Sequence, residues 1–267
     1  MRVIVTRPTA QSDTWVQALR QVGHDALAIP LIEIAPQPDA DAVTALWQRI
    51  HTFDALMFVS ANAVQHFFAL CPGDWSGPVL RNPGQRCFAT GPGTRAALLA
   101  AGVEGERVDA PPADAAQLDS EALWAVVQQR VFQGTRVLIV RGHGSSAAGQ
   151  QDAGSVGAGR AWFAARVLEH GGLVEYIAAY QRRVPPFSAT DLALAQAAAT
   201  DGSVWLFSSA EAVANLCTAL ATQPWQQARA LVTHPHIAEA ARKAGFGHVC
   251  QTRPTLAAVI ASIESLV

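Results

Sequence analysis

This 267-residue chain contains several short apolar runs, and each run is typical of a buried strand. Short turns of small and polar residues follow these runs. Where a parallel strand leads into a helix, the helix N-terminus presents unpaired backbone N–H groups that bind anions. These turns are therefore candidates for binding an anionic ligand. Their residues are Arg7, Ser60, Ala61, Asn62, Gly91, Pro92, Gly93, Thr94, Arg141, Ser209, Ala210 and Thr233.

Tyr180 is a second candidate. It is one of two tyrosines in the chain and ends an extended segment just before Arg182, Arg183 and Pro185. A phenol on a link between two domains would point into the space between them. A buried ring with a solvated hydroxyl, which is common for tyrosine, is the alternative explanation.

Familiar catalytic and cofactor motifs are absent from the sequence. It contains no Gly-x-Gly-x-x-Gly between a strand and a helix, no nucleoside-triphosphate loop and no Gly-x-Ser-x-Gly elbow. The four cysteines form no Cys-x-x-Cys pair, and His234 and His236 are spaced as turn residues rather than as metal ligands. We expect neither a cofactor nor a metal.

The charge distribution narrows the class of partner. A net charge of −2, spread without blocks, lacks the basic stripe of a nucleic-acid-binding protein. The first apolar run is too short for a signal peptide or a membrane span. We therefore expect a cytoplasmic protein that binds a small molecule and neither nucleic acid nor membrane. A monomer is the oligomeric state we consider for it, which the charges do not decide.

The chain contains an internal repeat. Its landmarks recur in the same order, which indicates a duplication. Residues 58–64 align with 207–213 at an offset of 149, Thr90, Pro92 and Gly102 with Thr233, Pro235 and Gly245 at an offset of 143, and residues 2–8 with 136–142 at an offset of 134.

Each half alternates apolar runs with longer amphipathic stretches, which indicates parallel sheets flanked by helices. The length exceeds one typical domain. The sequence therefore predicts an α/β fold of two similar, doubly wound, parallel-sheet domains. Predicted helix caps are Ser60, Gly93 and Thr94, and predicted helix stops are Gly23, Gly102, Gly171 and Gly245.

Tight turns alone explain small residues at any one of these positions, but their recurrence in matching order favours a binding cleft between two domains. Such a cleft could serve an enzyme or a two-lobed, non-catalytic binder of a small anionic ligand. A glycosyl or phosphoryl transferase is disfavoured because no nucleotide signature is present. Tyr180 distinguishes the first two classes, because a pure binder has no need of a phenol on the link.

The order and spacing of these motifs resemble the uroporphyrinogen-III synthase family from end to end. The resemblance rests on the opening VTRP with a downstream PLIEI, two F-x-S runs, a G-P-x-T turn, an R-G followed by G-R, a tyrosine before a basic pair, and a helix that ends in A-G-F.

The resemblance implies two domains joined by two extended strands. The first domain would comprise residues 1–34 and 182–267, the second residues 35–181, with the active-site cleft between them. The proline-ended segments 29–36 and 176–185 would be the paired links.

The resemblance also implies a cofactor-free lyase of heme biosynthesis. Its substrate would be hydroxymethylbilane, a linear tetrapyrrole with eight carboxylates, and its product uroporphyrinogen III, formed with loss of water and inversion of the last ring. Tyr180 would hydrogen-bond to or protonate the departing hydroxyl. Ser60, Thr94 and Ser209 match cleft positions of the family, whereas Arg7 and Arg141 would bind acetate or propionate groups or have a structural role.

Two segments depart from the family pattern. Residues 233–237 read Thr-His-Pro-His-Ile where the family has a glycine and then a hydroxyl. Residues 143–158, rich in Gly, Ala and Ser, are longer than the family's short turn. We expect a flexible loop there, with a lid as the alternative.

Overall fold

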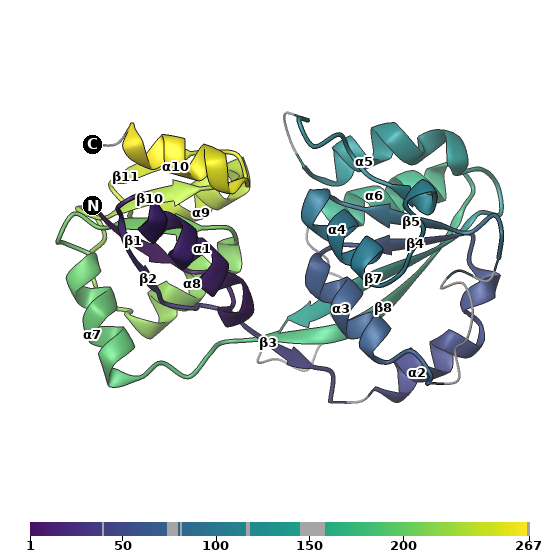
Figure 1. Cartoon of the computed structure of the whole chain (residues 1–267), viewed down its shortest axis with the longest axis horizontal. Coiled ribbons are helices and arrows are strands. Elements are labelled where there is room, and N and C mark those ends of the chain that lie inside the picture. The colour runs from purple at the N-terminus through teal and green to yellow at the C-terminus, as the bar shows by residue number, and fades with distance from the viewer. Residues whose placement is uncertain (39, 74–79, 81, 116–117, 145–157, 266–267) are drawn as a thin grey trace. The chain divides into compact units, whose positions relative to one another are not determined.

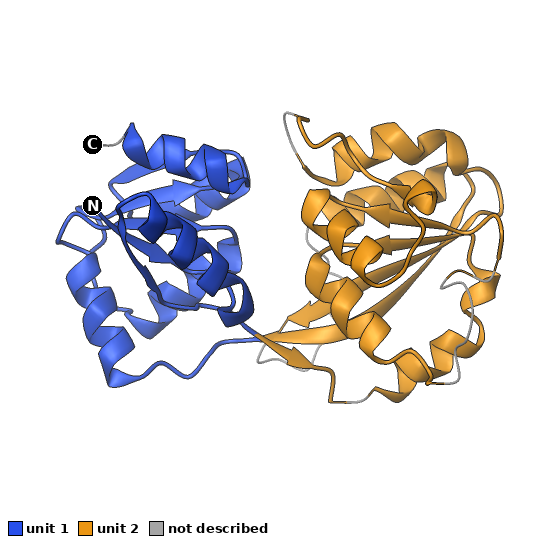
Figure 2. Cartoon of the chain, in the orientation of Figure 1, with its two compact units in different colours: residues 1–33, 183–267 blue, residues 34–182 orange. Residues whose placement is uncertain are grey.

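The structure, a computed structural model, describes the chain except residues 39, 74–79, 81, 116–117, 145–157 and 266–267. The predicted loop 143–158 thus falls almost wholly outside the described residues. The chain forms two compact units: unit 1 is Met1–Glu33 with Arg183–Val267, and unit 2 is Ile34–Arg182 (Figure 2). It passes between them within β3 (Glu33–Pro36) and at the end of β8 (Leu173–Arg183).

Unit 1 contains a parallel sheet in the order β11-β10-β9-β1-β2. Its central strands are apolar, and all four residues of β9, Val-Trp-Leu-Phe, are buried. Continuous apolar runs are typical of strands that are covered on both faces. The strands are β1 (Arg2–Val5), β2 (Asp25–Ala28), β9 (Val204–Phe207), β10 (Arg229–Val232) and β11 (His248–Gln251).

Helices cover both faces of this sheet (Figure 1). On one face, α1 and α10 pack on alternate residues of β1 and β9, including Val204 and Leu206. On the other face, the rings of Trp205 and Phe207 stack on each other, and Phe246 packs edge-on against Phe207. The helices are α1 (Thr9–Gln21), α7 (Ala189–Ala198), α8 (Ala210–Ala219), α9 (Pro235–Lys243) and α10 (Leu256–Glu264).

Unit 2 contains a sheet in the order β3-β8-β7-β4-β5-β6, in which the strands from β8 to β6 run parallel. β4 is buried along its whole length, as a central strand between two helical layers should be. The remaining strands are β4 (Ala55–Phe58), β5 (Arg86–Ala89), β6 (Val108–Asp109) and β7 (Arg136–Gly144).

The two faces of this second sheet carry separate hydrophobic clusters. Leu56 and Phe58 of β4 pack with α2, α3 and α4, whereas Ala55 and Met57 pack with α5 and α6. The sheet is therefore doubly wound. The helices are α2 (Asp41–Gln48), α3 (Ala61–Ala69), α4 (Pro92–Ala100), α5 (Ser120–Val127) and α6 (Ala158–Glu169), with 3₁₀ turns η1 (Ile50–Thr52), η2 (Gly105–Arg107) and η3 (Gln128–Arg130).

Both units have the same spatial plan but different chain order. β1 and β2 lie beside β9, β10 and β11 in unit 1, just as β7 and β8 lie beside β4, β5 and β6 in unit 2. Each copy of the repeat is therefore divided between the units. The predicted fold class, two similar doubly wound parallel-sheet domains joined by two extended strands, is confirmed.

Most predicted helix ends are confirmed as well. Ser60 caps α3, and the four predicted glycine stops have positive φ, from +77° to +96°. Gly93 and Thr94 are a correction, because the N-cap of α4 is Gly91 and both residues lie in the first turn. Pro92 explains the shift, since its fixed φ and missing N–H suit the first position of a helix.

Among the described residues, no helix is both long and apolar enough to span a bilayer.

Candidate functional site

The predicted site residues fall at the carboxyl edges of the two sheets. In unit 2, Phe58 pairs with both Ala89 and Val140, so β4, β5 and β7 reach a common edge. That edge carries Ser60, Ala61, Asn62, Gly91, Pro92, Gly93, Thr94, Arg141 and Tyr180. The corresponding edge of unit 1 carries Arg7, Ser209, Ala210 and Thr233.

The connections of each sheet change direction beside its first strand. In unit 2 the chain runs from β4 outward to β6 on one side, and from β7 to β8 on the other. Open α/β sheets bind ligands outside the carboxyl ends of the strands at this switch point. β4 with β7, and β9 with β1 in unit 1, are therefore the expected binding positions.

A β-bulge places Tyr180. β8 keeps a regular parallel register with β7 up to Ala178, and the register then shifts so that Gly142 lies opposite Tyr180. The shift leaves Ala179 as the extra residue. Because side chains alternate along a strand, the extra residue moves Tyr180 onto the same face as Ile177, in the hydrophobic cluster of α2, α3 and α4.

Gly142 lies directly beneath the ring of Tyr180. A β-carbon at position 142 would lie 2.6 Å from Cε2 and 2.9 Å from Oη of Tyr180, distances that β-carbons essentially never show. Tyr180 is only 4% exposed, so its ring has little room to move away. The absence of a side chain at residue 142 therefore allows the phenol to lie against β7.

Ser60 contacts the hydroxyl of Tyr180. As the N-cap of α3, Ser60 accepts a hydrogen bond at its Oγ from the backbone N–H of Ala63, at 3.1 Å. The same Oγ lies 3.2 Å from Oη of Tyr180. When the serine donates its proton to the phenol oxygen, the phenol keeps its own proton for another acceptor.

His66 supports the ring of Tyr180 from the body of α3. The two rings are stacked with their centroids 5.6 Å apart and their planes at 25°. Burial lowers the pKa of His66 below its ordinary value, so the imidazole is neutral at pH 7. Tyr180 thus has fixed contacts with β7 and with two positions on α3.

The turn before α4 exposes backbone rather than hydroxyl groups. Thr94 is 6% exposed, and its Oγ1 lies 3.5 Å from the hydroxyl of Thr90, which donates to the carbonyl of Val59. Pro92 and Gly93 are exposed. At this turn the hydroxyl of Thr94 faces inward, toward the sheet.

Arg7 is a cation at the carboxyl edge of unit 1. Its guanidinium lies 4.2 Å from the ring centroid of Trp15, and its Nη1 donates to Gln11 at 3.4 Å. Burial lowers the pKa of Arg7 to about 10, which still leaves it charged at pH 7. Its Nε is buried and has no hydrogen-bond partner in the described part of the chain. A buried donor without a partner calls for an acceptor.

Arg141 is the repeat counterpart of Arg7 in unit 2. It was predicted in a turn after a strand but lies within β7, because β7 continues to pair with β8 as far as Gly144. Its guanidinium lies 5.5 Å from the ring centroid of Tyr176. Its Nε and Nη1 are buried, and neither has a hydrogen-bond partner among the described residues. Both repeat copies therefore have an arginine that lies over an aromatic ring and has at least one buried N–H donor without an acceptor among the described residues.

The other residues of unit 1 form helix starts. Ser209 caps α8 and accepts a hydrogen bond from Glu211 at 3.2 Å, and Ala210 is the first residue of that helix. The N–H of Thr233 donates to the end of β9 at 3.2 Å. His234 caps α9, and its Nδ1 accepts from the N–H of the second following residue.

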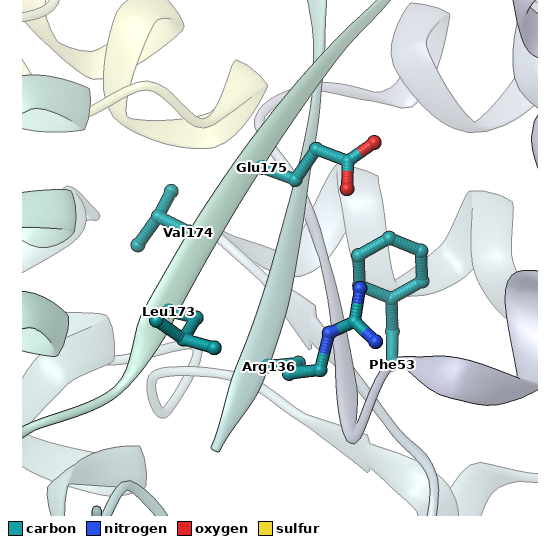
Figure 3. A pocket seen from close by; sticks show the side chains of 5 residues that line it. All are labelled: Phe53, Arg136, Leu173, Val174 and Glu175. Atoms are coloured by element: carbon teal, nitrogen blue, oxygen red, sulfur yellow. The ribbon is translucent and has the colours of Figure 1, made fainter. Parts of the chain in front are cut away.

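A pocket of about 210 Å³ lies at the opposite, amino edge of the sheet of unit 2 (Figure 3). Its polar groups already have partners, because Glu175 pairs with Arg49 and the guanidinium of Arg136 lies 5.2 Å from the ring centroid of Phe53. It is lined by Phe53, Arg136, Leu173, Val174 and Glu175.

Unit 1 has a larger pocket, of about 350 Å³, beside its link to unit 2. Pro30, Ile32 and Phe187 give it apolar walls, while Glu33 and Asp191 add two carboxylates. Those carboxylates disfavour an anionic ligand, so neither pocket competes with the strand ends as an anion site.

The sequence did not predict His66 as a site residue, and it predicted Gly142 only as a companion of Arg141 in a turn, not as the residue beneath Tyr180. Glycine after a strand is common, and a histidine on a helix is usually a packing residue. Their importance depends on the register shift in β8, which no local pattern predicts.

Three comparisons with known proteins agree. The model of the family described as uroporphyrinogen-III synthase HemD matches residues 13–261. A porphyrin biosynthesis protein HemD from Ruminiclostridium josui is 33% identical over 67 residues, which span 25% of this chain but only 13% of that protein.

Solved structures show the same fold. A mutant uroporphyrinogen III synthase from Thermus thermophilus is 15% identical, with a TM-score of 0.57 and coverage of 99% of this chain and 98% of that one. A uroporphyrinogen-III synthetase from Helicobacter pylori is 17% identical, with a TM-score of 0.54 and full coverage of both chains. Since the family match spans nearly the whole chain and the fold agrees, this chain belongs to the uroporphyrinogen-III synthase family.

Proposed function

We propose that this chain converts hydroxymethylbilane to uroporphyrinogen III, with loss of water and inversion of the last ring, in heme biosynthesis. Membership of the family supports this function. The single observation that carries it within this molecule is the fixed phenol of Tyr180, which lies over Gly142 with its hydroxyl 3.2 Å from Ser60.

The substrate carries eight carboxylates, and both sheet edges carry suitable donors. Arg7 and Arg141 have buried N–H groups without hydrogen-bond partners in the described chain, and a guanidinium binds a carboxylate with two parallel hydrogen bonds. The starts of α3, α4 and α8 add backbone N–H groups. We propose that one substrate molecule is held by the edges of both units, in a cleft between the domains predicted as 1–34 with 182–267 and 35–181.

Tyr180 is the proposed general acid. The bond between the terminal methylene and its hydroxyl breaks, the electron pair leaves with oxygen, and the phenol proton completes a water molecule. The pyrrole nitrogen supplies electrons to the methylene, which becomes an electrophilic azafulvene. Proton transfer of this kind usually contributes about 10²- to 10⁴-fold in rate.

Ring closure with inversion is mainly a matter of position. The substituted α-carbon of the last ring attacks the azafulvene and forms a spiro intermediate. That ring's original methylene bond then breaks and re-forms at its free α-carbon, whose proton can return to the Tyr180 phenolate. Holding the two chain ends together supplies the entropic part of the acceleration.

An isomer assay tests the proposal. Freshly generated hydroxymethylbilane is incubated with the wild type, with Tyr180→Phe and with Ile32→Val, which changes the repeat counterpart of Tyr180. The I and III isomers are then resolved after oxidation. We expect the III isomer from the wild type and from Ile32→Val, and a rate reduced by about 10²-fold or more for Tyr180→Phe.

Other outcomes are equally informative. If only the spontaneous I isomer forms, the synthase function is wrong, and a two-lobed, non-catalytic binder of anions becomes the better account. If Tyr180→Phe retains the full rate of III formation, the function stands but the general-acid role of Tyr180 does not.

The proposal includes a monomer in the cytoplasm that needs no nucleic acid, membrane or cofactor. Light scattering during turnover measures the oligomeric state directly. A dimer as the active species would contradict this part.

A further inference from the structure

A second group of hydrogen-bond donors lies on the opposite face of the unit 2 sheet from Tyr180. Arg141 and Tyr176 belong to the face that carries Val137 and Ile139, which pack under α5 and α6. Side chains alternate along β7 and β8, and the bulge turns only the residues beyond Ala178. The end of β7 therefore has Tyr180 on one side and this group on the other.

Arg160 joins the group from the first turn of α6. Burial raises the pKa of the Tyr176 hydroxyl, and the charges of Arg141 and Arg160 both oppose that rise. The positive charges of Arg141 on β7 and Arg160 on α6 therefore both act on the hydroxyl of Tyr176 on β8, so three elements contribute to one group. The guanidinium of Arg141 also lies over the Tyr176 ring, at 5.5 Å from its centroid.

The chemistry of this group indicates its ligand. Two guanidinium groups and a phenol offer N–H and O–H donors, and Arg141 forms no ion pair with a carboxylate of the described residues. Its Nε and Nη1 are buried and have no acceptor within the part of the chain that the structure describes. Tyr176, 37% exposed, adds an aromatic surface. Such a set suits a carboxylate carried by a flat, apolar ring.

We propose that Arg141, Arg160 and Tyr176 form a carboxylate site, the α6-face site, that binds one acid side chain of the tetrapyrrole. This inference rests on the proposed function and deepens it. The site and Tyr180 lie on the two faces of the strand end where the connections change direction, between the starts of α3 and α6. An acid side chain held on the α6 face orients its pyrrole relative to the phenol on the α3 face.

Equilibrium binding of uroporphyrin, the stable oxidised form of the product, tests the site without turnover. Fluorescence titrations compare the wild type with Arg160→Gln, Tyr176→Phe and Arg166→Gln. Arg166 is the matched control, because it lies on the same helix and is paired with Glu169 at 2.9 Å. We expect Kd to rise about tenfold for Arg160→Gln and about threefold for Tyr176→Phe, and to stay within about twofold for Arg166→Gln.

The outcome that overturns the site is an Arg160→Gln variant that binds uroporphyrin as tightly as Arg166→Gln does. If Arg160→Gln does not fold, as judged by circular dichroism, Tyr176→Phe decides, and an unchanged Kd then overturns the site. Titrations with coproporphyrin, which has four carboxylates, give a second readout. Because coproporphyrin keeps the propionates and has methyl groups in place of the acetates, a smaller effect with it indicates an acetate at this site, and an equal effect indicates a propionate.

This experiment separates the two proposals. Formation of the III isomer reports the synthase function, and the Arg160 dependence of Kd reports the α6-face site. A wild type that forms the III isomer while Arg160→Gln binds normally removes only the site. A wild type that forms no III isomer, but whose uroporphyrin affinity depends on Arg160, removes only the function.

Discussion

In both units, a helix side chain at the equivalent repeat position contacts one of the two link segments, but the two contacts differ. In unit 1, Asn215 of α8 donates from its Nδ2 to the backbone carbonyl of Leu31 at 2.7 Å. The repeat offset of 149 makes His66 of α3 its counterpart, and His66 stacks on Tyr180 instead. The helix of unit 1 thus binds the backbone of the link segment, whereas the helix of unit 2 contacts the side chain of Tyr180.

The residues around these contacts differ in the same direction. The counterpart of Tyr180 is Ile32, a buried aliphatic side chain that is 6% exposed. The counterpart of Gly142, at the offset of 134, is Pro8, the N-cap of α1. Both units retain an arginine and helix starts that can bind anions. The duplication therefore preserved an arginine and helix starts in both units, while the buried phenol, our proposed general acid, is present in one copy only.

The largest effect is expected from a substitution that fills the space under Tyr180, because unit 1 has no corresponding contact. In Gly142→Ala, the new β-carbon would lie 2.6 Å from Cε2 of the ring, so the phenol must move. We expect kcat to fall about 10²-fold, since a displacement near 1 Å of a catalytic group can have that effect. Steady-state kinetics of III-isomer formation measure it, with circular dichroism to verify folding.

Pro8→Ala is the matched control in unit 1, and its kcat should stay within about twofold of the wild type. A fully active Gly142→Ala enzyme would show that the position of the Tyr180 ring on β7 is irrelevant to turnover.

Removal of helix caps should have a smaller effect on kcat, and it distinguishes a loss of stability from a loss of activity. Ser60→Ala, Ser209→Ala and Thr255→Ala each remove a side-chain cap, on α3, α8 and α10. Each should lower the free energy of unfolding by about 1 kcal/mol, measured by urea denaturation. Only Ser60→Ala should also lower kcat, by about tenfold, because only Ser60 contacts the Tyr180 hydroxyl.

Thr255→Ala is the control here, since α10 lies outside the site and its kcat should not change. Equal kcat values for Ser60→Ala and Thr255→Ala would reduce Ser60 to a helix cap.

The smallest expected effect concerns His66 and pH. Its pKa is lowered by burial, so the unfolded chain takes up the proton first as the pH falls through about 6.5. Stability should therefore decrease in the range from the unfolded pKa down to the folded one. His66→Asn, which introduces the residue found in unit 1, should flatten this part of the profile.

Urea denaturation at intervals between pH 5 and pH 8 measures the slope, with the exposed His51 changed to Asn as the control. A His66→Asn profile parallel to that of the wild type would argue against a half-buried, neutral imidazole beside Tyr180.

Much of this fold could be predicted from sequence because its signals are local. Apolar runs buried on both faces, Ser60 as a cap, and glycine stops at positive φ such as Gly102 each depend on a few neighbouring residues. The family prediction is confirmed for the same reason, since the order of many short turns is itself a pattern.

The contacts of Tyr180 could not be predicted, because they depend on register. One extra residue, Ala179, decides which face the tyrosine occupies, and through it which glycine and which histidine it meets. The start of α4 at Gly91 instead of Gly93 has a similar origin, because a proline and two glycines allow several starting points. Sequence patterns identify elements well, but a shift of one residue changes the partners of a side chain.

The exchange of segments between the repeat copies also affects how the chain is made. β1 is a central strand, and its Val3 pairs with Val204 of β9. A ribosome adds about 5 to 20 residues per second, so about 10 to 40 s pass between the synthesis of β1 and the synthesis of β9. Unit 2 is continuous, from Ile34 to Arg182, and is synthesised completely in the meantime. The N-terminal βαβ segment thus leaves the ribosome first and completes its sheet last, with one apolar strand edge open throughout that interval.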